Sequence, residues 1–145
     1  MPAAEKLDVL NELLRGEIAA VETYQQAMAK IGSDPGAAEL RRLHDEHREA
    51  ANTLRQHIRG HDGTPGHGSG AWGKWAKAVE GVAKLFGNTA ALKALKEGEE
   101  HGVKSYEQAL EGKGLPEECK ALVRDRLLPQ TRAHLPVLDR LMSAQ

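Results

Sequence analysis

Aromatic side chains are scarce in this chain of 145 residues, at 3% of the sequence. Helix-favouring residues such as Ala, Leu, Glu, Lys and Arg are plentiful instead. A β-sheet draws on aromatic and β-branched side chains, so the composition argues against a sheet protein. It predicts packed helices and, at this length, a single domain that spans residues 1–145.

Cysteine, net charge and long apolar segments are also scarce or absent, and each of these features excludes a class of protein. The single cysteine, Cys119, excludes an internal disulfide and fits a reducing compartment. The formal net charge is −1 with both signs mixed, so no basic face for nucleic acid is expected. The segment MPAAEKLDVLNELL lacks the apolar core of a signal peptide, and no apolar run approaches membrane-spanning length. We therefore expect a soluble, cytoplasmic protein without a membrane partner.

Helical periodicity and turn residues divide the chain into two similar halves. Long helices are predicted over about 4–30, 36–59, 89–111 and 117–142, with Asn88 or Thr89 capping the third. A glycine-rich segment, 60–70, precedes a shorter amphipathic stretch, 72–86, which holds both tryptophans. These lengths predict an all-α, antiparallel four-helix bundle of two hairpins, 4–59 and 89–142, whose crossover, 60–88, carries a short extra helix.

An internal repeat supports this division. Residues 16–28 align without gaps on residues 98–110, and six of the thirteen positions are identical: Gly, Glu, Val, Tyr, Gln and Ala. The identities include Tyr24 and Tyr106, which are the two tyrosines of the chain. Chance similarity between two amphipathic helices would preserve Leu and Ala rather than a rare Tyr seven residues after a Glu. The two halves therefore have a common ancestor, or the same requirement preserves these residues in both.

The core-facing positions of these helices include acids and imidazoles. Steps of three and four residues define an apolar seam on each helix, and Glu17 and Glu99 fall on the first and third seams. The second and fourth seams contain His47 and His134. The four seams are Leu10, Leu14, Glu17, Val21, Tyr24, Met28 and Ile31; Leu40, Leu43, His47, Ala50 and Leu54; Leu92, Glu99, Val103, Tyr106 and Leu110; and Leu127, Thr131, His134 and Leu138.

A buried carboxylate must be protonated, paired or bound to a cation, because burying its charge alone costs several kcal/mol. Two acids and two histidines in one layer supply oxygen and nitrogen ligands suited to iron, manganese or zinc. The plainer interpretation is that the acids pair with neighbouring Arg, His or Tyr side chains and that each histidine is a satisfied core residue. Both interpretations stay open at the level of the residues.

The segments GEIAAVETY and GEEHGVKSY resemble the ferritin-like superfamily, particularly its rubrerythrin branch. The segments ALKALKEGEEHGVKSYEQAL and LPEECKALVRDRLLPQTRAHLPVLDRL are closer to a family of small bacterial ferritin-like proteins of unassigned function. The resemblance implies a di-iron site with one Glu from each of two helices and Glu-x-x-His from each of the others. Glu17 and Glu99 match the first kind of ligand.

The Glu-x-x-His motifs are not intact in this chain. Glu46 is followed three residues later by Glu49, and Thr131 stands three residues before His134. Pro129 and Pro136 are expected to disturb the fourth helix around His134. The reduced ligand set is Glu17, His47, Glu99 and His134, with Glu46 as a possible fifth ligand. The hydroxyls of Tyr24 and Tyr106 are expected to donate hydrogen bonds to the carboxylates one or two turns away.

Two functions follow from this set. The first is a metal-binding protein, with iron or manganese ahead of zinc, that handles iron or peroxide under stress, as the resemblance implies. The second is a metal-free bundle that serves as a structural or protein-interaction module. Whether it is an enzyme, which substrate it takes and whether it forms a homodimer stay open.

Four other histidines and Cys119 give little evidence for a functional site. We expect His44 and His101 at the surface. His61 and His67, near an aspartate in the glycine-rich loop, form only a weak metal pattern. Cys119 has no sequence neighbour that would make it a nucleophile.

Overall fold

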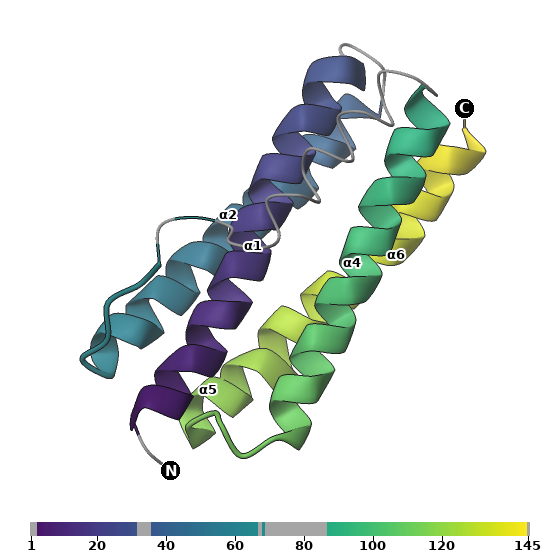
Figure 1. The fold of residues 1–145 in the computed structure, drawn as a ribbon. Helices are drawn as coiled ribbons and strands as arrows, with labels where there is room; N and C mark the ends of the chain where they lie inside the picture. Colours follow the sequence, from purple (N-terminus) through teal and green to yellow (C-terminus); the bar gives the residue numbers. More distant parts are fainter. Residues whose placement is uncertain (1–2, 32–35, 67, 69–86, 145) are drawn as a thin grey trace.

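The computed structural model describes residues 3–31, 36–66, 68 and 87–144, and this part of the chain is helical without strands. Four helical rods lie side by side, with the N-terminus at the lower end of Figure 1 and the C-terminus at the upper end. They are α1 (Ala3–Ile31), α2 (Ala37–Gly60), α4 (Asn88–Glu111) and a composite rod of α5 (Glu117–Leu122), the π-helical turn η2 (Val123–Leu127) and α6 (Leu128–Ser143).

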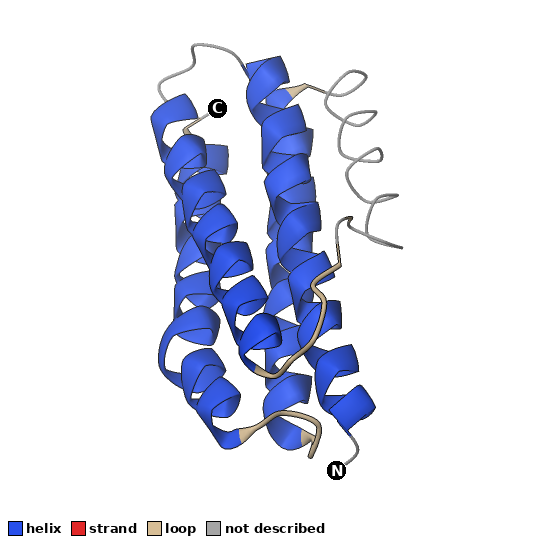
Figure 2. Ribbon diagram, turned by 90° about the vertical axis from the view of Figure 1, so that its left-hand side faces the viewer, coloured by secondary structure: helices blue, strands red, loops and turns tan. Residues whose placement is uncertain are grey.

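The rods pack around a core that a polar layer divides in two. α1 packs along α2, α4 packs along α6, and α1 also contacts α4. Figure 2 shows the helices lying side by side from a second direction. One apolar cluster contains Leu10, Leu54 and Leu127, and the other contains Leu40, Leu92 and Leu138. On every rod, the residues of these clusters lie on either side of the predicted Glu or His position. The seams therefore hold a polar layer between two apolar ones.

Most of the predicted seam is confirmed by burial. Every member of the α2 seam and of the α6 seam is buried, including His47 and His134. Glu17 and Glu99 are buried as well, with 5% and 3% of their surface exposed. Val21, Met28, Val103 and Leu110 are only half-buried. The alternation of three and four residues thus located the core face of each helix.

The fourth rod departs from a regular α-helix where Pro129 requires it. Proline has no N–H to donate to the carbonyl four residues earlier, and its ring collides with that carbonyl. In the turn before it, the Leu128 N–H donates to the Val123 carbonyl, five residues back, so the chain widens into a π turn. The helix then continues through Pro136.

Two details of the connections differ from the sequence-based expectations or lie beyond them. The residue that caps α4 is Gly87 rather than Asn88 or Thr89, and no side chain caps this end. Its φ of 86° is in the left-handed region, which glycine adopts without steric cost. The short helix expected over 72–86 lies outside the described residues.

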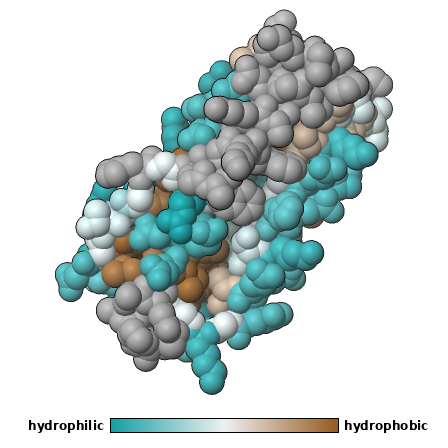
Figure 3. Space-filling view, in the orientation of Figure 1, coloured by the Kyte–Doolittle hydropathy of each residue, from teal (hydrophilic) through white to brown (hydrophobic). Residues whose placement is uncertain are grey.

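Hydrophilic side chains cover much of the described part of the face that Figure 3 shows. Hydrophilic side chains line the right-hand edge in Figure 3, along α4, and apolar ones appear near the lower ends of α1 and α2. None of the helices described here combines the length and apolarity that a membrane-spanning segment requires.

Candidate metal centre

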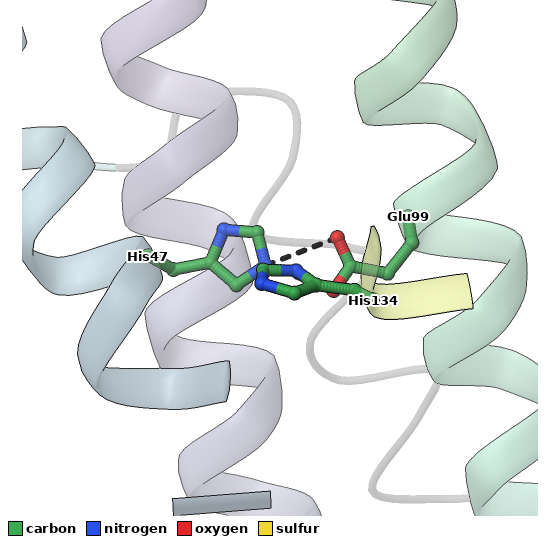
Figure 4. Close-up of side chains that lie close together, drawn as sticks. All are labelled: His47, Glu99 and His134. Atoms are coloured by element: carbon green, nitrogen blue, oxygen red, sulfur yellow. Dashed lines mark hydrogen bonds and ion pairs between the residues drawn. The ribbon is translucent and has the colours of Figure 1, made fainter. Parts of the chain in front are cut away.

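Each of the four rods contributes one side chain to the polar layer. Glu17 comes from α1, His47 from α2, Glu99 from α4 and His134 from α6, and each is at most 5% exposed. In Figure 4, the rings of His47 and His134 converge on the carboxylate of Glu99. The two rings meet edge to face, with centroids 4.8 Å apart. The structure thus brings these four predicted residues into one buried layer.

Glu99 is the centre of the layer. Its Oε2 accepts a hydrogen bond of 2.6 Å from the Tyr24 hydroxyl. The same oxygen lies 2.9 Å from His47 Nε2 and 2.8 Å from His134 Nδ1. A single carboxylate therefore joins side chains from α1, α2 and α6.

Glu17 has a similar but smaller set of partners. Its Oε1 accepts a hydrogen bond of 2.5 Å from the Tyr106 hydroxyl, and its Oε2 lies 2.6 Å from His47 Nδ1. The imidazole of His47 therefore stands between the two glutamates of the repeat, with one nitrogen facing each.

Glu46 completes the layer at its edge. Its Oε1 lies 2.8 Å from His134 Nε2, and its Oε2 accepts a hydrogen bond from Arg42. The Glu46 side chain is 25% exposed, so this end of the layer reaches solvent. Glu46 thus contacts the ring nitrogen of His134 that does not face Glu99, as Glu17 does for His47.

The pKa values of the layer follow from its charges. Burial alone would raise the pKa of Glu99, but the positive charge of His47 and hydrogen bonds from both histidines lower it to about 2. Burial opposes a charge on His47, yet Glu99 and Glu17 raise its pKa well above 6.5. Burial and the neighbouring carboxylates also raise the pKa of Tyr24 and Tyr106 well above 10.0, so both hydroxyls keep their protons.

The donor set fits a divalent transition metal. His47, Glu99 and His134 each offer one ligand atom, and these atoms lie within 4.8 Å of one another. Imidazole nitrogen and carboxylate oxygen suit iron, manganese and zinc. Glu17 and Glu46 belong to the same network through the far nitrogens of the two imidazoles.

A small pocket of about 50 Å³ lies beside Glu17 and Glu99, between α1 and α4. Its half-buried walls are small residues from both copies of the repeat: Gly16, Ala20, Gly98, Gly102 and Ser105. A water molecule needs roughly 10–15 Å³ of such space, so the pocket has room for a few molecules of about the size of water. Sequence reasoning missed it, although the glycines at equivalent positions of the repeat were its signal.

The other histidines singled out from the sequence differ in where they lie. His101 is exposed as expected, but the expectation for His44 was wrong, because its ring is buried at 6% exposure. His44 Nδ1 lies 2.9 Å from Asp45, and Nε2 lies 3.3 Å from Gln25 Nε2. His61 lies at the end of α2 and approaches Cys119, whereas His67 lies outside the described residues.

The fold and this site define an all-helical bundle protein with a buried histidine–carboxylate cluster. A family model described as "Domain of unknown function (DUF2383)" matches residues 5–112, and the chain belongs to this family. The matched segment includes Glu17, His47 and Glu99 but ends before His134. Among curated proteins and solved structures, none matches the chain.

Proposed function

We propose that this protein binds one divalent iron or manganese ion, with zinc as a weaker candidate, through His47, Glu99 and His134. The observation that carries the proposal is that three buried donors from three helices hold their ligand atoms within 4.8 Å of one another. We also propose that the bundle is ferritin-like, with antiparallel hairpins over 4–59 and 89–142 joined by the crossover 60–88.

The contacts of the two imidazoles support this choice of ligands. His47 Nε2 and His134 Nδ1 both face Glu99, while their other nitrogens face Glu17 and Glu46. Histidines that bind metals commonly donate the second N–H to a carboxylate, which fixes the ring. We therefore assign Glu17 and Glu46 to orienting the rings rather than to the metal itself. Two imidazoles and one carboxylate are typical of mononuclear, non-haem iron(II) sites.

The charge of the layer also supports a divalent ion. In both histidines each nitrogen faces a carboxyl oxygen, so without a metal one proton must lie in each of these N–O contacts. One divalent ion bound to two neutral imidazoles carries the same total charge as two imidazolium rings. Metal binding would therefore exchange up to two protons for the ion without changing the charge buried in the core.

The pocket supports a role with small molecules. It reaches Glu17, Glu99 and both tyrosines, and its size suits water, dioxygen or peroxide rather than an organic substrate. Bound iron would supply one-electron and peroxide chemistry. The chain's own residues would restrict access and, through the tyrosine hydroxyls, hold the carboxylates in place. We accordingly propose iron or peroxide handling under stress as the physiological role.

Elemental analysis after anaerobic loading with Fe²⁺ or Mn²⁺ tests this proposal. We expect about one ion per chain in the wild type and at least a tenfold loss in Glu99→Gln, since a ligand is removed. Glu100→Gln is the matched control, because Glu100 is the exposed neighbour on the same helix. Far-ultraviolet circular dichroism verifies that each variant is folded. Equal metal content in Glu99→Gln and Glu100→Gln would refute the assignment.

A metal-free structural or interaction module is the second candidate. It is favoured by the observation that, among the described residues, every buried side-chain nitrogen or oxygen has a hydrogen-bond partner. Protons alone, without a metal ion, satisfy the contacts of the polar layer. Such a hydrogen-bonded network would fix the register of the helices. Negligible metal in folded wild-type protein after loading would favour this candidate.

A further inference from the structure

A second cluster of donor side chains lies where the end of α2 meets the start of α5. His61 Nε2 lies 2.6 Å from Glu118 Oε1 and 4.0 Å from Cys119 Sγ. His57, one helical turn before His61, places Nδ1 3.2 Å from the same sulfur. This cluster shares no residue with the layer around Glu99.

The donors of this cluster are those of a zinc-type site. One atom each from His61, Glu118 and Cys119 lies within 4.8 Å of the others. Thiolate and imidazole together favour zinc, which takes four ligands in a tetrahedron. His57 Nδ1 also lies near the sulfur, but His57 is not one of the three residues whose ligand atoms lie within 4.8 Å of one another. The three donors are of the chemical types that zinc uses, and a zinc ion held by three protein ligands takes water as its fourth ligand.

The surroundings allow an ion to enter and help to hold it. Cys119 is fully buried, whereas His61 and Glu118 expose 29% and 66% of their side chains. An ion can thus reach the sulfur from the solvent side. The carbonyl end of the long helix α2 also carries a partial negative charge that favours a cation.

A reactive thiol is the competing interpretation of Cys119. Cys119 exposes none of its surface, so the sulfur is not open to a molecule bulkier than an ion. Burial, with a smaller effect of Glu118, also raises the pKa of the thiol to about 11, so it is not a thiolate nucleophile at neutral pH. A bound metal ion would displace the thiol proton, as in other cysteine sites.

We propose that Cys119, His61 and Glu118 form a second metal site of the zinc type that ties α2 to α5. His61 and Cys119 are 58 residues apart in the sequence, so the ion closes a long loop between the two halves of the chain. Because the donors come together only in the folded chain, the free energy of binding the ion stabilises the fold.

Titration of the full chain with Co²⁺ tests the proposal, because cobalt bound to a thiolate gives a near-ultraviolet charge-transfer absorption that oxygen and nitrogen ligands do not give. We expect this absorption to saturate in the wild type and in Glu99→Gln, which lacks a ligand of the first site. It should disappear in Cys119→Ala. Zn²⁺ should bleach it and raise the melting temperature of the wild type.

If Cys119→Ala does not fold, variants of the two exposed ligands still test the proposal. His61→Gln and Glu118→Gln should each weaken Co²⁺ binding by at least about tenfold, because each removes a ligand. Glu117→Gln is the matched control, since Glu117 is an exposed neighbour on the same turn. Absence of the absorption in folded wild type at saturating Co²⁺, or equal affinity in Glu118→Gln, His61→Gln and Glu117→Gln, would overturn the proposal.

Discussion

The Tyr24 hydroxyl donates a hydrogen bond of 2.6 Å to Glu99, which belongs to the other copy of the repeat. Tyr106 does the same for Glu17, at 2.5 Å. Each tyrosine thus stabilises the buried carboxylate of the opposite copy. This crossed arrangement gives a physical reason for a repeat that contains both a Glu and a Tyr seven residues later, because neither copy satisfies its own carboxylate with its own tyrosine.

Removing either tyrosine hydroxyl should destabilise the protein. Tyr24→Phe and Tyr106→Phe keep the ring packing but take away a donor to a buried carboxylate, which costs about 1.5–3 kcal/mol when the acceptor is charged. Urea unfolding in the presence of a chelator measures the change. Unaltered stability in both variants would show that the hydroxyls are incidental to the layer.

Glu46 should tune metal affinity without being required for it. Glu46→Gln removes the carboxylate that faces His134 Nε2, and losing such an orienting partner typically costs 10–100-fold in affinity. The measurement is Mn²⁺ affinity by calorimetry, with exposed Glu49→Gln on the same helix as the control. Complete loss of binding in Glu46→Gln would instead make Glu46 a direct ligand.

The stability of the metal-free protein should be greatest in mildly acidic solution. The raised pKa of His47 means that its contribution is complete below pH 6.5 and is lost as the pH rises through the raised value. The lowered pKa of Glu99 means that its contribution is complete above pH 4.5 and is lost as the pH falls toward about 2. Denaturant midpoints measured in chelator from pH 3 to 9 test this. A steady rise in stability up to pH 9 would contradict it.

Gly102→Ala should stabilise the fold while narrowing the pocket. A Cβ at this position would lie 3.5 Å from Thr131 Cγ2, an ordinary contact distance. Alanine in a helix interior is more favourable than glycine by roughly 0.5–1 kcal/mol. Thermal unfolding measures the gain, and slower Fe²⁺ uptake with unchanged final content would report the narrower access. A loss of stability would mean that α4 and α6 approach more closely than the structure has them.

The spacing of the seam residues predicted which side chains face the core but not which side chains they contact. Spacing of three and four residues identified Glu17, His47, Glu99 and His134 as inward-facing, and all four are buried. The same pattern could not assign partners, because it gives the face of a helix but not the height or rotation of its neighbour. His44 shows the limit, since it lies beside the seam and is nevertheless buried against α1 through Gln25.

The cluster around Cys119 could not be found from sequence spacing. His57 and His61 are a visible pair one turn apart, but their partners Glu118 and Cys119 follow after more than fifty residues. The glycine-rich loop drew attention to the pair His61 and His67 instead. Only the meeting of α2 with α5 shows which donors lie together.

Three properties follow from the amino-acid sequence alone: the chain is helical, its two halves repeat, and acids and imidazoles point into the core. These properties are local, because helix propensity and the 3.6-residue turn fix them within one segment. The tertiary structure decided that Glu99 joins both histidines, that the tyrosines cross between the halves, and that Glu17 and Glu46 face the outer nitrogens. Those pairings depend on how four helices are staggered and rotated against one another, and side-chain packing over the whole core sets that arrangement.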